Sequence, residues 1–138
     1  VRRVAPKHDA YQSSPLETQT IQSTIGHLLP QSREQVVPYA QDLGYKDLPL
    51  AGQQSYTLVR GRDTPQSPRG YLGRAGLYEV MDVTEEIQNL IVKQATSAEI
   101  QRMAVQQGMI TMRQDGYLKA LSGITTLEEV NRVAADTA

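Results

Sequence analysis

Few side chains in this sequence could carry out chemistry, and they do not form a recognisable catalytic set. The two histidines, His8 and His27, lie outside any cluster of serine, cysteine and aspartate, so neither is expected to activate a nucleophile. The glycine-rich loop that ends in Gly-Lys-Ser or Gly-Lys-Thr, whose backbone amides and lysine hold phosphates, does not occur. No pair of carboxylates follows a buried strand in a way that would position magnesium. We therefore predict no catalytic residue in this chain.

Arg74 is the candidate for a binding residue. It follows a stretch that contains Gly70 and Gly73, and its guanidinium is a rigid fork suited to a phosphate, or to a carboxylate across a subunit interface. A structural ion pair is the alternative role. Arg74 is the cofactor-binding residue that we predict from the sequence.

Length and composition narrow the class of protein. The 138 residues are enough for one domain, or one domain and a smaller lobe. The net charge of −1 gives no reason to expect broad electrostatic binding to nucleic acid or membrane. The chain has no cysteine, which excludes disulfides and thiolate metal sites, and no apolar run approaches the ~18 residues that span a bilayer. It carries no signal-peptide pattern. Because it begins with valine instead of methionine, we expect a piece of a longer protein.

The elements that must position these residues alternate between β-prone and helical segments in the first part of the chain. We predict strands over 1–5, 55–60 and 74–83, helices over 14–29 and 33–43, and loops over 6–13 and 62–73. Ser14 and Glu17 form a capping box with Pro15 in the first turn, and Gly44 is a natural helix end. Because the segment 74–83 carries apolar residues on both faces, we expect it to be buried on both sides.

The last third of the chain predicts four short helices with clear ends. Helix starts lie at Thr84, Thr96, Thr111 and the pair Thr125 and Thr126, and the apolar residues behind each start follow the helical period. Thr125 is the expected cap of the last helix, whose Leu127 and Val130 should face the core. Gly116 is a poor helix former, and we interpret it as a site of close packing.

Together these segments predict a mixed α/β fold of the α+β type, in which a short, partly antiparallel sheet is joined to a C-terminal helical bundle. We expect two parts. Residues 1–73 would form a strand and a lobe with inserted helices that resembles a degenerate metal finger, and residues 74–138 a C-terminal strand and four helices.

Two sequence motifs resemble a known family. They are Gly70-Tyr71-Leu72-Gly73-Arg74-Ala75-Gly76 and Gly123-Ile124-Thr125-Thr126-Leu127-Glu128-Glu129-Val130. In this order and spacing they resemble the C-terminal region of the hexameric ATPases that drive type II secretion and type IV pilus assembly. Residues 1–4 look like the strand that leaves the ATPase core of that family. The resemblance covers these residues and 70–133, about half the chain, whereas 9–58 match loosely.

The resemblance implies a role in subunit packing and in coupling ATP hydrolysis to protein secretion or pilus assembly. The parent protein would bind ATP and magnesium, and this fragment, which lacks the ATPase core, would hold no cofactor and be inactive alone. The implied partners are neighbouring subunits of a homo-hexamer and inner-membrane platform proteins, with no nucleic acid. The implied location is cytoplasmic, peripheral to the inner face of the membrane. Arg2 and Arg3 would lie near nucleotide in the intact ATPase, or form a solvated strand edge.

The family usually holds one zinc ion with two pairs of cysteines. The equivalent positions here are Ala5, His8, Asp63 and Gln66. Alanine cannot bind zinc and glutamine is a poor ligand, so the closed set of four ligands that structural zinc needs is incomplete. We predict that the chain holds no metal.

Two other classes of protein are alternatives. A nucleic-acid- or protein-binding helical module is one, although a nucleic-acid site needs a basic stripe and the helices from Thr84 onward are close to charge-balanced. An independent small enzyme is the other, and it lacks a convincing nucleophile and base.

Overall fold

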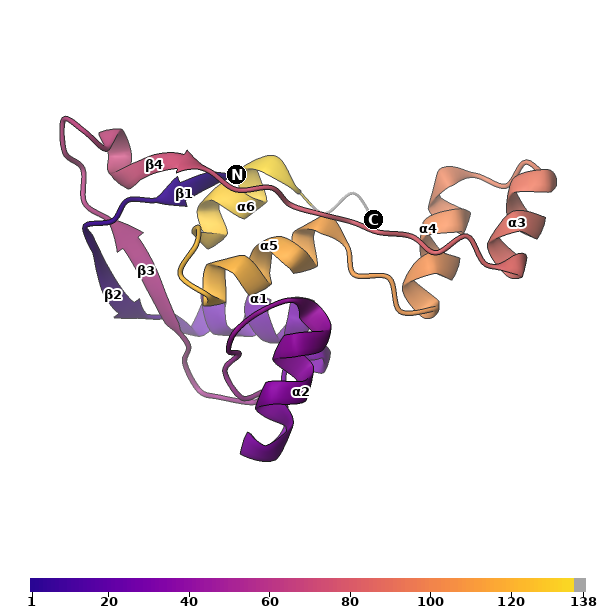
Figure 1. Ribbon diagram of the computed structural model, residues 1–138, viewed down its shortest axis with the longest axis horizontal. Helices are drawn as coiled ribbons and strands as arrows, with labels where there is room; N and C mark the ends of the chain where they lie inside the picture. The colour runs from indigo at the N-terminus through magenta and orange to yellow at the C-terminus, as the bar shows by residue number, and fades with distance from the viewer. Residues whose placement is uncertain (136–138) are drawn as a thin grey trace.

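The computed structural model describes residues 1–135, which form six α-helices, two short 3-10 helices and four strands (Figure 1). In chain order the elements are β1 (Arg2–Val4), β2 (His8–Gln12), α1 (Pro15–Ile25), η1 (Gly26–Leu28), α2 (Arg33–Leu43), β3 (Thr57–Gly61), η2 (Pro68–Gly70), β4 (Tyr71–Arg74), α3 (Glu85–Val92), α4 (Ser97–Gln106), α5 (Met112–Leu121) and α6 (Leu127–Val133). The mixture of helices and antiparallel strands confirms the predicted α+β class.

The strands form two antiparallel pairs. β1 pairs with β4, with Arg2 opposite Arg74 and Val4 opposite Tyr71, and β2 pairs with β3 over its whole length. The pairs meet where the backbones of Gly61 and Gly70 touch, and a Cβ atom added to either glycine would overlap the carbonyl group of the other. Two glycines are required here because any side chain would force the two pairs apart.

Three of the sequence-based strand and loop predictions are wrong. Residues 6–13 were expected to be a loop, but His8–Gln12 is a strand whose paired residues in β3 lie 45 to 53 positions further along the chain. The strand expected over 74–83 ends at Arg74, and the predicted loop over 62–73 contains η2 and most of β4. Beyond Ala75, which donates its N–H to the Val1 carbonyl at 2.8 Å, no described strand lies beside the segment, so its backbone is extended but unpaired.

The segment 75–84 is also exposed, contrary to the expected burial on two sides. The exposed fractions of Tyr78 and Val80 are 68% and 76%, and that of Val83 is 53%. Leu77 is half-buried and packs against the core, but the other large apolar residues of this segment lie on the surface.

The hydrophobic core lies between α1, α5, α6 and β3. Ile21 and Ile25 of α1 are fully buried, and so is Leu29, which follows η1 where the predicted helix 14–29 no longer continues as α-helix. Leu127 and Val130 of α6 are buried in the same cluster, as the sequence predicted. This core connects the first half of the chain with its last two helices.

The helix ends follow the predicted caps with one difference, at the last helix. Ser14, Thr96 and Thr111 form complete capping boxes, and Thr84 caps α3 through the amide of Ile87. Ser32 begins α2 without a hydrogen bond from its side chain. Thr126, not Thr125, caps α6, since the Thr126 hydroxyl accepts the amide of Glu129 at 3.1 Å.

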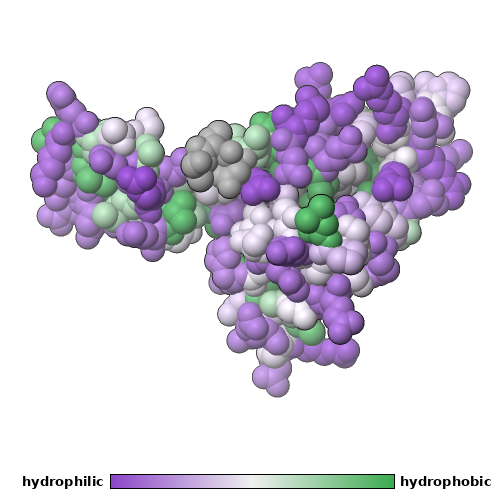
Figure 2. Space-filling model, turned by 180° about the vertical axis from the view of Figure 1, so that it is seen from behind, coloured by the Kyte–Doolittle hydropathy of each residue, from purple (hydrophilic) through white to green (hydrophobic). Residues whose placement is uncertain are grey.

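The four C-terminal helices form two pairs, α3 with α4 and α5 with α6. Figure 1 shows α5 and α6 against the strands and α1, whereas α3 and α4 form a helical hairpin at the far end of the extended segment. In Figure 2 the hairpin is a narrow lobe with apolar side chains on its surface. Ile91, Val92 and Val105 are exposed there by 49%, 81% and 41%.

Gly116 allows α5 and α6 to approach closely, as its sequence context suggested. It is buried, and a Cβ atom at this position would lie 2.5 Å from Cγ1 of Val130. We expect Gly116→Ala to lower the free energy of unfolding by about 1–3 kcal/mol, the usual cost of overpacking, despite the better helix propensity of alanine. Urea denaturation measures the change.

Gly26→Ala is the matched control for that prediction. Gly26 has a helical φ of −54°, and the nearest atom to an added Cβ is the Cβ of Gln22 at 3.9 Å. This variant should be neutral or slightly more stable. Equal loss of stability in the two variants would show that close packing is not the reason for glycine at position 116.

Candidate functional site: a strand–helix joint and an adjacent groove

A buried carboxylate joins the first strand to the last helix. Glu129 on α6 has a side chain with no exposed surface. It accepts the backbone N–H of Arg2 at 2.7 Å and two bonds from the Arg2 guanidinium, both at 2.9 Å. It also accepts two bonds from Arg132, at 2.7 and 3.0 Å. Five donors therefore converge on one carboxylate, and two of the pairs are bidentate.

These contacts fix the charge of Glu129. Hydrogen bonds from the Arg132 guanidinium, and then from Arg2, hold the pKa of Glu129 far below its ordinary value of 4.5, although burial acts in the opposite direction. The carboxylate is consequently ionised in the folded protein at neutral pH. The pair of cations makes a buried negative charge tolerable in this position.

Further contacts bind β1 to the start of α6. The Arg2 guanidinium lies over the Tyr71 ring, 4.3 Å from its centroid, and the Tyr71 hydroxyl lies 2.7 Å from the Thr126 hydroxyl. Thr125 donates to the Arg2 carbonyl at 2.8 Å, and Val4 donates to the Ile124 carbonyl at 2.9 Å. We call this set the strand–helix joint: Arg2, Tyr71, Thr125, Thr126, Glu129 and Arg132.

The joint corrects two predictions. Arg2 was expected either near a nucleotide or on a solvated edge, but it is committed to Glu129. Thr125 was expected to cap α6, but its hydroxyl holds the β1 backbone instead. The sequence analysis missed Glu129. Its only local signal is Arg132, three residues later on the same helix face, because Arg2 lies 127 positions away.

A second polar cluster attaches the extended segment to α5. Asp115 accepts the Tyr45 hydroxyl at 2.7 Å, the Lys119 ammonium at 2.7 Å and the backbone N–H of Tyr78 at 3.0 Å. Burial, followed by the hydrogen bond to Asp115, raises the pKa of the Tyr45 hydroxyl far above its ordinary range. Tyr45 therefore stays a neutral donor. Asp115 is a structural anchor that the sequence analysis did not identify.

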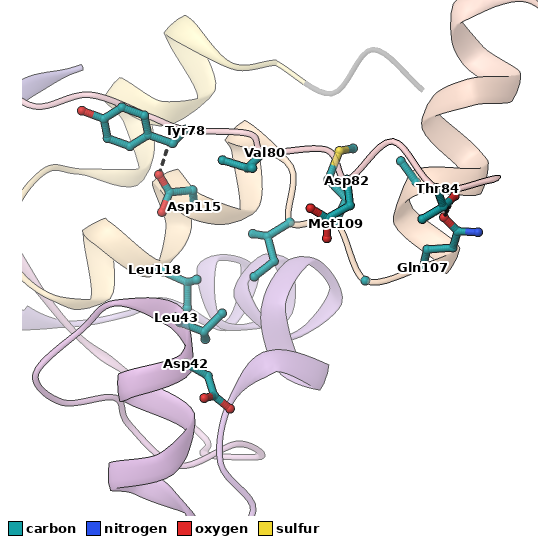
Figure 3. Close-up of a pocket in the computed structure, with 13 residues that line it drawn as sticks. Asp42, Leu43, Tyr78, Val80, Asp82, Thr84, Gln107, Met109, Asp115 and Leu118 are labelled. Carbon is teal, nitrogen blue, oxygen red and sulfur yellow. Dashed lines mark hydrogen bonds between the residues drawn. The ribbon is translucent and has the colours of Figure 1, made fainter. Parts of the chain in front are cut away.

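Beside this cluster lies an open groove of about 360 Å³. Figure 3 shows Val80 and Met109 on one side and Leu43 and Leu118 on the other, with Asp42 and Asp82 at the rim. Thr84, which caps α3, also donates to the Gln107 side chain at 2.7 Å and so joins the start of α3 to the end of α4. Neither Asp42 nor Asp82 has an ion-pair partner within residues 1–135. We call this feature the acidic groove.

Arg74 lies opposite Arg2 in the β1–β4 pair, four residues before Tyr78 of the groove. It is the last residue of β4, and its side chain is exposed. Among the described residues no carboxylate pairs with it, so the structural ion pair that we considered does not occur there. The role of Arg74 in binding stays a prediction.

The positions equivalent to the family's zinc ligands have other roles. The carbonyl of Ala5 lies 3.0 Å from Nδ1 of His8, and Asp63 accepts the backbone N–H of Arg69 at 3.1 Å. Gln66 is exposed beside the bridge between Thr64 and Ser67. Within residues 1–135 no three histidine, cysteine, aspartate or glutamate side chains are grouped as metal ligands. Here the paired β2 and β3 hold the region together through their backbones.

Within the part of the chain that the structure describes, no helix combines the length and the apolar character needed to cross a membrane.

A family described as Type II/IV secretion system protein matches residues 11–132, which is nearly the whole chain. The chain therefore belongs to this family, and the resemblance that its glycine motifs suggested is confirmed. Membership supports a role in secretion or pilus assembly.

Individual relatives match the chain in part. It is 43% identical over 79 residues to the type II secretion system protein E of Xanthomonas campestris, and 48% identical over 67 residues to the type IV pilus assembly ATPase PilB of Pseudomonas aeruginosa. It is 49% identical over 61 residues to PilB of Thermus thermophilus. These matches cover 57%, 49% and 44% of this chain but only 14%, 12% and 7% of the relatives. The chain thus corresponds to a small part of each relative.

Proposed function

We propose that this chain is the C-terminal region of a hexameric ATPase for type II secretion or type IV pilus assembly. It packs against neighbouring subunits and couples ATP hydrolysis elsewhere in the parent protein to movement of the secretion or pilus machinery. ATP and magnesium are bound outside this chain, whose own ionisable clusters hold the fold together. The machine lies in the cytoplasm against the inner face of the membrane, where inner-membrane platform proteins are its partners.

The observation that carries this proposal is the strand–helix joint in a member of this family. By resemblance, β1 continues the chain that leaves the ATPase core. A displacement of that chain would reach α6 directly, because β1 is fastened to α6 by a bidentate ion pair and by backbone bonds. α5 moves together with α6, because the Val130 side chain of α6 packs closely against Gly116 of α5. The region thus moves as a rigid body, the usual way in which such motions are transmitted.

Removal of this region from the parent protein tests the proposal. We expect the truncated protein to keep nucleotide binding but to lose hexamer formation and secretion or pilus extension in a cell that lacks the intact gene. A second parent, in which Glu128 of the exposed face of α6 is replaced by alanine, is the control that should work normally. Full export by the truncated protein would contradict the proposed role.

The isolated chain should be folded but inactive towards ATP. The physical reason is that it has capped helices and a closed core but no phosphate-binding loop. We expect no phosphate release above background when purified chain is incubated with ATP and magnesium. Turnover that remains after a second purification, and that falls on Arg74→Ala, would show that the chain carries an active site of its own.

A further inference from the structure

The charges of this chain are separated along its long axis. The strand end, residues 1–13 and 57–74, carries seven lysines and arginines and only two carboxylates. The segment 77–111, with the hairpin, carries five carboxylates and two cations. Figure 1 shows the paired strands at one end of the molecule and the α3–α4 hairpin at the other, with the extended segment between them. An elongated molecule with opposite charges at its two ends favours association of one end with the other.

The strand end presents an apolar side chain among free cations. Leu72 on β4 is 51% exposed, and an added Cβ at its neighbour Gly73 would lie 3.7 Å from Cδ of Arg3. Arg74 follows two residues later. Within residues 1–135 neither Arg3 nor Arg74 is paired with a carboxylate. We call Arg3, Leu72 and Arg74 the basic patch.

The acidic groove has the complementary chemistry. Its lining combines polar side chains with apolar ones such as Leu43 and Leu118, and Val80 at its mouth is 76% exposed. Its rim carries Asp42 and Asp82, which lack cationic partners among the described residues. An occupant that matches this site therefore has one apolar side chain between two cations. The basic patch of the same chain has that composition.

We propose that the basic patch of one copy docks into the acidic groove of the next, with Leu72 against Val80 and Arg74 paired with Asp82. The inference rests on the proposed role in subunit packing and names the surfaces that would serve it. The contact is heterologous, so each copy in a row uses both of its ends. Such contacts close into a ring when the rotation between copies allows it and otherwise form a filament.

A second copy explains more of the surface than an anionic membrane or nucleic acid does. Either of those would neutralise Arg3 and Arg74 but would leave Asp42, Asp82 and the exposed apolar segment 77–83 without a partner. Docking between copies covers both charged ends and buries Leu72 and Val80. Such electrostatic complementarity also sets the orientation of the partners.

Because the chain has no cysteine of its own, a disulfide between two single-cysteine variants can join only the introduced residues. One chain carries Leu72→Cys and a second, distinguishable by a size tag, carries Val80→Cys. Both positions are exposed, so neither variant should disturb the fold. When the two are mixed in equal amounts and oxidised, we expect the mixed disulfide dimer to exceed its random share. Leu16→Cys, at a site on α1 that is 73% exposed, is the matched control for random collision and should give no enrichment with either partner.

Charge reversal tests whether the crosslink depends on the proposed ion pair between Arg74 and Asp82. Adding Arg74→Glu to the Leu72→Cys chain should lower the initial rate of mixed dimer formation by about fivefold, the ratio expected for an exposed ion pair at the upper end of its range. Adding Asp82→Arg to the Val80→Cys chain should then restore the rate. High salt should also lower the rate of mixed dimer formation between the two chains that carry no charge reversal.

Two results would overturn the inference. One is a mixed dimer at its random share, or one that charge reversal does not affect. The other is binding of the chain to phosphatidylglycerol vesicles through Arg74 without enrichment of the mixed dimer. If either occurs while truncation of the parent still abolishes hexamers and export, this docking mode fails and the proposed function stands.

Discussion

Replacement of Glu129 by alanine should lower the free energy of unfolding by about 2–4 kcal/mol. The variant removes the acceptor of five hydrogen bonds and leaves the Arg2 backbone N–H without a partner. The cost stays below that of a fully buried ion pair, because the Arg2 and Arg132 side chains are 37% and 58% exposed and can regain water. Denaturation by urea measures the effect.

The neighbouring Glu128 provides the matched control. It is the same residue type on the same helix, but its side chain is exposed. Glu128→Ala should change the stability by no more than about 0.5 kcal/mol, as is usual for a surface substitution. If the two variants are equally stable, the joint is not what holds β1 to α6, and the mechanical argument for coupling loses its support.

The pH dependence of that difference has a defined sign. Because the pKa of Glu129 is lower in the folded protein than its ordinary value of 4.5, its stabilisation is fully present above pH 4.5 and is lost as the pH falls below it. Glu129→Gln keeps the volume but cannot titrate. The stability difference between wild type and this variant should therefore shrink as the pH is lowered. A difference that grows would mean that the carboxylate is protonated in the fold.

The helices of this chain could be predicted because their signals are local. The capping boxes at Ser14, Thr96 and Thr111 lie within four residues of the helices that they start, and the structure contains all three. The error at Thr125 is instructive. Either of two adjacent threonines could cap this helix from its sequence. The Thr125 hydroxyl donates to the Arg2 carbonyl, and the Thr126 hydroxyl is the one that caps α6.

The strands were harder to predict because pairing is not local. β2 has no clear alternation of apolar residues, since its sequence is exposed at nearly every position, and its partner is distant in sequence. The residues 75–83 show the opposite case. They have a strand-like composition, but the described chain offers them no neighbouring strand, so they stay extended and exposed. A high β-propensity shows that a segment could fit into a sheet, but it does not show that a partner strand is available.

The candidate site was missed for the same reason. Glu129 and Arg2 come from opposite ends of the chain, and a single sequence gives no sign that they meet. Arg74 was proposed as a binding residue because of the glycines before it, and that role stays a prediction. The structure places it on the strand end, without a carboxylate among residues 1–135, and so leaves it free for an intermolecular contact.

Truncation of Leu127 should cost about 2–5 kcal/mol, the usual range for a buried leucine. The residue is 7% exposed and packs in the core cluster with Val130 and Leu118, so Leu127→Ala leaves a cavity between α5 and α6. Thr126→Ala removes the cap of the same helix and should cost only about 0.5–2 kcal/mol.

The order of these two effects is the test. A urea midpoint that Leu127→Ala leaves unchanged would mean that α6 is not docked in the isolated chain. Because Glu129 lies on the same helix, that result would also predict a silent Glu129→Ala. If both variants are destabilised as expected, α6 is held from two sides, by the core through Leu127 and by β1 through Glu129. Force applied to β1 would then act on α6 against a packed core, which is the condition that rigid-body coupling requires.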